Sequence, residues 1–109
     1  MGYQVDLAIN GQQTLEMFSN NTYNLIILDA GLPDIQGIEV GKKIRILEKN
    51  NKANRMPIIL LSAYPPNNLK KWCQEAEIDN FSTKPILYQD LYVMLETIFN
   101  QKAVNNEIF

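Results

Sequence analysis

The stretch LIILDAGLPDIQG, residues 25–37, is the part of the sequence that decides the fold. The short continuous apolar run Tyr23–Leu28 leads into it and is typical of a parallel strand buried on both faces. Two glycines and a proline then mark a loop. Apolar residues at helical spacing follow over Ile38–Glu48. A strand, a loop and a helix in this order predict one βα unit of a parallel sheet.

The same alternation continues along the chain. Further strands are expected at Tyr3–Ile9, Pro57–Leu61 and Ile78–Thr83. Further helices are expected around Leu15 and Phe18, after Pro65 and Pro66, and over Leu87–Phe99. Arg45 is expected off the apolar face of its helix, and Trp72 and Cys73 are expected to be packing residues of theirs. We therefore predict an α/β fold with a doubly wound parallel sheet, in one domain over residues 1–100 with a tail over 101–109.

The composition excludes several classes of function. The 109 residues include no histidine and only one cysteine, Cys73, which rules out Ser-His catalysis, the usual zinc sites and an internal disulfide. The ten Lys and Arg are scattered and the net charge is −2, so nucleic acid is not an expected partner. The sequence has no run of about eighteen apolar residues, so we expect no membrane contact and a cytoplasmic location.

Polar side chains stand at the ends of three predicted strands. Asp29 follows one apolar run, Ser62 follows the next, and Lys84 follows the strand around Phe81. Taken alone, Asp29 could be a turn aspartate, Ser62 a strand-end hydroxyl and Lys84 a surface charge. Phe81 could be an ordinary core residue. Because functional sites lie at the carboxyl ends of parallel strands, the three polar groups are expected to meet there. A carboxylate, a hydroxyl and an ammonium together suit a phosphoryl group.

At these residues the chain resembles the receiver family of two-component signalling proteins. The matching stretches are GYQVDLAINGQQTLEMF, LIILDAGLPDIQG, IILLSAY and DNFSTKPI, in the family's order. The resemblance implies a flavodoxin-like receiver fold with Asp29 as the phospho-acceptor. It implies further roles for four residues: Ser62 as the switch hydroxyl, Phe81 as the aromatic switch, Lys84 as the site lysine, and Pro85 after a cis bond.

The sequence departs from the family pattern at its start. The family's first strand, its two adjacent acidic residues and its first helix have no counterpart before Tyr3. Those acids normally hold Mg²⁺ beside the acceptor, together with a backbone carbonyl that matches Gly31. Asp6 is no substitute, because it lies within a predicted strand. We therefore expect Asp29 and Gly31 to bind Mg²⁺ weakly or not at all.

The resemblance implies a phosphorelay receiver rather than an enzyme, with a histidine kinase or histidine phosphotransfer domain as partner. The segment IDNFSTKPILYQDLYVML is similar to receivers attached to hybrid sensor kinases. The alternative is a pseudo-receiver, an interaction module without phosphoryl chemistry, which the missing acidic pair favours. An unpaired strand edge would also remain where the first strand is lacking. We therefore expect a homo-oligomer, or a shift of Tyr3–Ile9 to pair with Tyr23–Leu28.

Overall fold

Three parallel strands alternate with helices along the chain. The structure, a computed structural model, describes residues 6–97. The elements are α1 (Gly11–Asn20), β1 (Ile26–Asp29), α2 (Gly37–Asn50), β2 (Ile58–Ser62), α3 (Leu69–Glu75) and β3 (Asn80–Thr83), and residues 88–97 are helical. The predicted tail over 101–109, like Ile98 and Phe99, lies outside the described residues.

The sheet has the order β1-β2-β3, with every pairing parallel. Ile26 stands opposite Ile58, and Ile59 stands opposite Asn80. Helices cross from each strand to the next, because parallel neighbours need a long connection. The predicted α/β fold with a parallel sheet is thereby confirmed.

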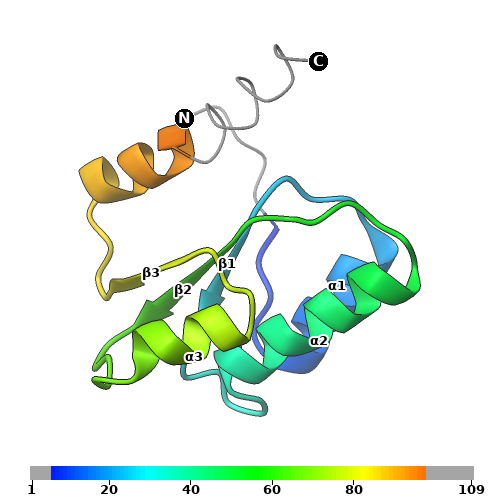
Figure 1. Ribbon diagram of the computed structural model, residues 1–109, viewed down its shortest axis with the longest axis horizontal. Helices are drawn as coiled ribbons and strands as arrows, with labels where there is room; N and C mark the ends of the chain where they lie inside the picture. The colour runs from blue at the N-terminus through cyan, green and yellow to red at the C-terminus, as the bar shows by residue number, and fades with distance from the viewer. Residues whose placement is uncertain (1–5, 98–109) are drawn as a thin grey trace.

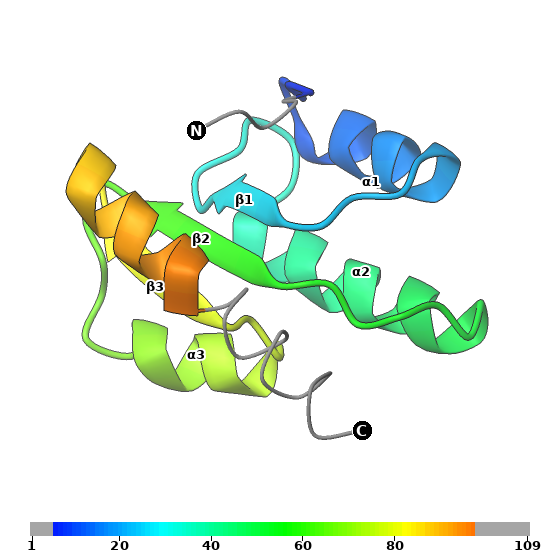
Figure 2. The ribbon, with the colours of Figure 1, turned by 90° about the horizontal axis from the view of Figure 1, so that it is seen from above.

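The helices are divided between the two faces of the sheet. Figures 1 and 2 show α1, α2 and α3 on one face and the helical segment 88–97, in orange, on the other. Leu95 of that segment and Ile59 of β2 are buried, although neither belongs to the main core cluster. Both faces of β2 are therefore covered, as a doubly wound sheet requires.

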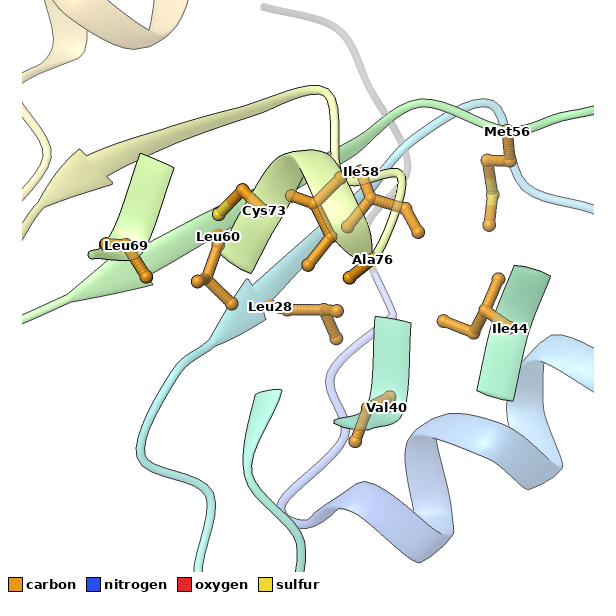
Figure 3. Close-up of a cluster of buried hydrophobic side chains, with 10 residues drawn as sticks. Leu28, Val40, Ile44, Met56, Ile58, Leu60, Leu69, Cys73 and Ala76 are labelled. Atoms are coloured by element: carbon orange, nitrogen blue, oxygen red, sulfur yellow. The ribbon is translucent and has the colours of Figure 1, made fainter. Parts of the chain in front are cut away.

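The main core fills the space between the sheet and the first three helices. In Figure 3, Leu28 and Leu60 of the sheet lie among side chains of α2 and α3. Val40 and Ile44 of α2 are completely buried, and Cys73 of α3 is 3% exposed. This packing fixes the height at which each strand ends, and so the position of the polar groups that follow.

Two predictions about the strands are wrong. Residues 6–9 are not in a strand, and the start of the predicted Tyr3–Ile9 strand lies outside the described residues. A strand needs a hydrogen-bonded neighbour, and in the described part of the chain β1 pairs with β2 alone. For the same reason β1 is not buried on both faces, and Ile27 is 42% exposed.

Two predictions about helix faces are also wrong. Trp72 lies on the outer side of α3 with 41% of its surface exposed, whereas the predicted inward packing holds for Cys73. Arg45 is only 4% exposed, although helical periodicity places it off the apolar face of α2. Its guanidinium donates to Glu48 within α2 and also to Glu77 and Asp79, which lie after α3 and which a single helix pattern does not reveal.

Candidate phospho-acceptor site

The structure brings Asp29 and Lys84 into direct contact. The Nζ atom of Lys84 lies 2.5 Å from Oδ2 of Asp29. The other carboxylate oxygen, Oδ1, accepts a hydrogen bond from the amide of Gly31 at 2.9 Å. These two hydrogen bonds, that from Lys84 first, hold the pKa of Asp29 below its usual range. Asp29 is therefore an ionised carboxylate at neutral pH.

Ser62 reaches the same edge through the sheet register. Asp29 stands opposite Leu61, and Ser62 is the next and last residue of β2. The carbonyl of Ser62 accepts a hydrogen bond from the amide of Lys84 at 2.8 Å. Ser62 is 7% exposed, whereas the Asp29 and Lys84 side chains are 41% and 35% exposed. The acidic and basic groups are thus open to solvent, whereas Ser62, at the end of β2, is buried.

The loop after Asp29 returns to the end of β1, so that Gly37 lies against the backbone of Asp29 and Ala30. The amide of Gly37, the first residue of α2, donates to the carbonyl of Ala30 at 3.1 Å. A Cβ atom at Gly37 would lie 2.4 Å from the Asp29 carbonyl oxygen and 2.9 Å from Cδ1 of Leu60. Only glycine allows α2 to begin this close to the strand end. The sequence predicts Gly37 only as a loop residue, because the close contact with Asp29 is set by the fold.

The remaining predicted residues surround this edge. Phe81 of β3 is partly buried, packs on the core cluster and stands opposite Leu60 in the sheet. The Lys84–Pro85 peptide bond is cis. Gly31 is exposed beside the Asp29 carboxylate. The switch roles of Ser62 and Phe81 and the metal role of Gly31 stay predictions.

Asp34 is a further residue of the loop that sequence analysis did not single out. Its carboxylate accepts hydrogen bonds from the amides of Gly11 and Gln12, in the first turn of α1. These bonds and one from the amide of Ile35 lower the pKa of Asp34. The sequence carries no signal for this contact, because an aspartate in a proline-containing loop is ordinary turn chemistry.

Comparison with known proteins agrees with this arrangement. The family profile described as the response regulator receiver domain matches residues 1–96. The chain belongs to the response regulator receiver family. The receiver predicted from sequence is thereby confirmed, and receiver domains generally bind Mg²⁺ at an acidic pocket.

Relatives of this receiver include whole signalling proteins. The receiver is 30% identical, over 96% of its length, to hybrid signal transduction histidine kinase K of Dictyostelium discoideum. It is 33% identical, over 94% of its length, to the transcriptional regulatory protein CusR of Escherichia coli strain K12. The receiver spans only 9% of the first relative and 43% of the second.

Solved structures share the fold. A CheY-like receiver domain protein from Methanospirillum hungatei JF-1 matches with a TM-score of 0.82 at 24% identity, over 95% of this chain and 79% of that one. The co-crystal structure of the Saccharomyces cerevisiae phosphotransfer protein Ypd1 with the receiver domain of Ssk1 matches with a TM-score of 0.76 at 28% identity. That match covers 84% of this chain and 68% of the other.

The described residues do not make a complete Mg²⁺ site. Within residues 6–97, no three His, Cys, Asp or Glu side chains lie together as metal ligands. Asp29 offers one carboxylate, and Asp34 is engaged by α1. Mg²⁺ prefers a near-octahedral set of oxygen ligands.

Proposed function

We propose that this receiver takes a phosphoryl group onto Asp29 from a phosphohistidine of a histidine kinase or histidine phosphotransfer domain. The observation that supports it is the contact of Lys84 with the Asp29 carboxylate, at the edge where β2 ends in Ser62. The relatives, which include hybrid histidine kinases, favour this function over an interaction module without phosphoryl chemistry. The domain is proposed to act as a signalling receiver and not as a turnover enzyme.

The geometry suggests how the transfer proceeds. A carboxylate oxygen of Asp29 attacks phosphorus, an O–P bond forms, and the P–N bond to the partner's imidazole breaks. The imidazole nitrogen keeps the electron pair and is protonated by water. Lys84 then exchanges its contact with Oδ2 for the phosphoryl oxygens, where its charge offsets the negative charge. The hydroxyl of Ser62 is proposed to hydrogen-bond one of those oxygens.

Mass spectrometry after treatment with a small phosphodonor tests the acceptor. We expect one added phosphoryl group on the wild-type chain, mapped to Asp29, and none on Asp29→Asn. Asp90→Asn is the comparison, because it alters an exposed aspartate of the helical segment 88–97 and leaves the acceptor loop unchanged. A phosphoryl group retained by Asp29→Asn would contradict the assignment.

We further propose that Mg²⁺ binds weakly. Among residues 6–97, no three acidic side chains lie together as metal ligands, and the Asp29 carboxylate is already paired with Lys84. A missing carboxylate ligand is worth at least about 1 kcal/mol of binding. Loss of two ligands would weaken binding by at least about tenfold relative to a receiver with three acidic ligands. Isothermal titration measures this directly, with such a receiver as the reference. Equal affinities would show that other residues complete the site.

We also propose that two copies of the chain associate along β1. The proposed location of the protein is the cytoplasm. In the described part of the chain, β1 has one neighbour, and Ile27 is 42% exposed beside its open edge. No helix within residues 6–97 has the length and apolarity to cross a membrane. Neither nucleic acid nor a membrane is proposed as a partner of the domain.

Sedimentation equilibrium tests the association. Ile27→Lys places a charge beside the open edge and should lower the association constant at least about tenfold. Ile46→Lys is the matched control, because Ile46 is an equally apolar side chain on α2 with 57% exposure. A wild-type chain that stays monomeric at every concentration would refute the homo-oligomer.

A further inference from the structure

The loop that follows Asp29, residues 30–36, supplies hydrogen-bond acceptors for the first turn of α1. A helix begins with backbone amides that have no partner within the helix. The amide of Gln13 is satisfied locally, by the side chain of Asn10 at 2.7 Å. The amides of Gly11 and Gln12 instead donate to Oδ1 and Oδ2 of Asp34 at 2.7 and 2.9 Å. Asp34 lies more than twenty residues along the chain, so a distant carboxylate caps α1.

The backbone of α1 also packs tightly against this loop. Gly11 is buried, and a Cβ atom there would lie 3.0 Å from Cβ of Ile35 and 3.0 Å from Cγ2 of Val40. It would also lie 3.2 Å from Oδ1 of Asp34. The backbone of Gly11 therefore lies against side chains of the loop and of α2, and the helix start cannot move far without displacing them.

The same loop holds the acceptor carboxylate at its other end. The amide of Gly31 donates to Oδ1 of Asp29 at 2.9 Å, and the amide of Gly37 donates to the carbonyl of Ala30 at 3.1 Å. Only Leu32 and Pro33 separate Gly31 from Asp34. A displacement of Asp34 should thus reach Gly31, because this short segment is hydrogen-bonded to Asp29 at one end and to α1 at the other.

We propose that Asp34 is a positioning residue for phosphoryl transfer: by gripping the first turn of α1, it holds the loop that orients Asp29. The inference rests on the proposed function of Asp29, but its structural half can be measured without any phosphoryl transfer. A displacement of the start of α1 would therefore reach the acceptor site, because the carboxylate of Asp34 joins that helix to the loop. Asp34 itself touches neither Asp29 nor Lys84 through any described hydrogen bond or ion pair.

Two variants separate positioning from simple helix capping. Asp34→Ala removes the cap that comes from the loop, and Asn10→Ala removes the cap that comes from the helix's own flank. Both variants expose amide donors in the first turn of α1. Only Asp34→Ala should change the loop. Asp34→Asn keeps one oxygen acceptor and should fall between wild type and Asp34→Ala.

Amide hydrogen exchange and chemical shifts, read by NMR on the full chain, provide the structural measurement. In Asp34→Ala we expect exchange at Gly11, Gln12 and Gly31 to rise about tenfold or more, with a shift of the Gly31 amide signal. In Asn10→Ala we expect faster exchange at Gln13 alone. An unchanged Gly31 amide in Asp34→Ala would reduce Asp34 to a helix cap and overturn the inference.

The rate of phosphoryl uptake from a small phosphodonor provides the functional measurement. Asp34→Ala should lower the rate about tenfold, because small misplacements of reacting groups are costly, while Asn10→Ala stays within about twofold of wild type. Equal losses in both variants would overturn the positioning role. If the wild-type chain takes up no phosphoryl group, the proposed function fails, and the Gly31 amide still decides whether Asp34 holds the loop.

Discussion

At the carboxyl edge of the sheet, Lys84 pairs with Asp29, and the two side chains are 35% and 41% exposed. At the amino edge, Arg45 pairs with Glu48 at 2.7 Å, and each side chain is 5% exposed. The two pairs use the same kinds of charge in opposite surroundings. An exposed pair adds little to stability and can exchange partners, whereas a buried pair is held to its geometry because an unpaired charge is costly there.

The amino edge is tied together by more than one pair. Arg45 also donates to Oδ2 of Asp79 at 3.1 Å and to the carbonyl of Glu77 at 2.9 Å. Oε2 of Glu48 accepts from the amide of Met56, just before β2. Oδ2 of Asp79 accepts from the amide of Ile58 at 2.7 Å. This network joins α2 to the starts of β2 and β3, so the buried ion pair lies at the edge opposite to the proposed acceptor site.

The largest expected effect breaks the amino-edge pair. Glu48→Ala leaves the buried Arg45 guanidinium without its closest carboxylate and should lower the free energy of unfolding by about 3–5 kcal/mol. Glu39→Ala is the matched control, since Glu39 pairs with Lys42 at the same helical spacing with 53% exposure. It should cost about 0.3–0.5 kcal/mol. Urea denaturation measures both, and similar costs for the two would remove the contrast between buried and exposed pairs.

The next effect concerns packing at the carboxyl edge. Gly37→Ala forces a Cβ atom against the Asp29 carbonyl oxygen and should cost about 1–3 kcal/mol of unfolding free energy. Gly31→Ala is the control, because its Cβ atom would meet only Oδ1 of Asp29, at 3.8 Å. Thermal unfolding of the two variants decides the point. An unchanged midpoint for Gly37→Ala would show that the loop adapts.

A smaller effect is expected from the exposed pair. Lys84→Met removes the ammonium from Asp29 and should change the free energy of unfolding by less than about 1 kcal/mol. The pKa of Asp29 should rise toward its ordinary value, because Lys84 is the main cause of its depression. An NMR titration of the Asp29 carboxyl carbon follows that pKa. A stability loss as large as that of Glu48→Ala would contradict the division between the two edges.

The smallest effect is the pH dependence of the exposed pair. Because the pKa of Asp29 is lowered on folding, its contribution is fully present above the unfolded-state pKa, about 4. The contribution is lost as the pH falls from there through the folded-state pKa. The stability difference between wild type and Lys84→Met should therefore shrink below about pH 4. A difference that grows in acid would show the opposite linkage.

The sequence by itself determined the alternation of strands and helices and the residues at the strand ends. Apolar runs of strand length have few other uses in an α/β domain, and parallel strands bring their carboxyl ends to one edge. Asp29, Ser62 and Lys84 could be selected on that ground, and the structure places Asp29 against Lys84. The roles of Ser62 and Phe81 rest on the family resemblance.

Only the tertiary structure decided how each segment is paired. The alternating pattern of residues 6–9 fits a strand, but strand formation depends on a neighbour, which local sequence does not specify. Arg45 has the sequence pattern of a surface cation, but Glu77 and Asp79, in the connection between α3 and β3, supply partners for it. The local sequence predicts an ordinary turn residue at Asp34, whereas in the structure its carboxylate accepts hydrogen bonds from two amides of α1. In each case a contact between distant parts of the chain outweighs the local pattern, because hydrogen-bond partners for buried or terminal groups are set by the fold.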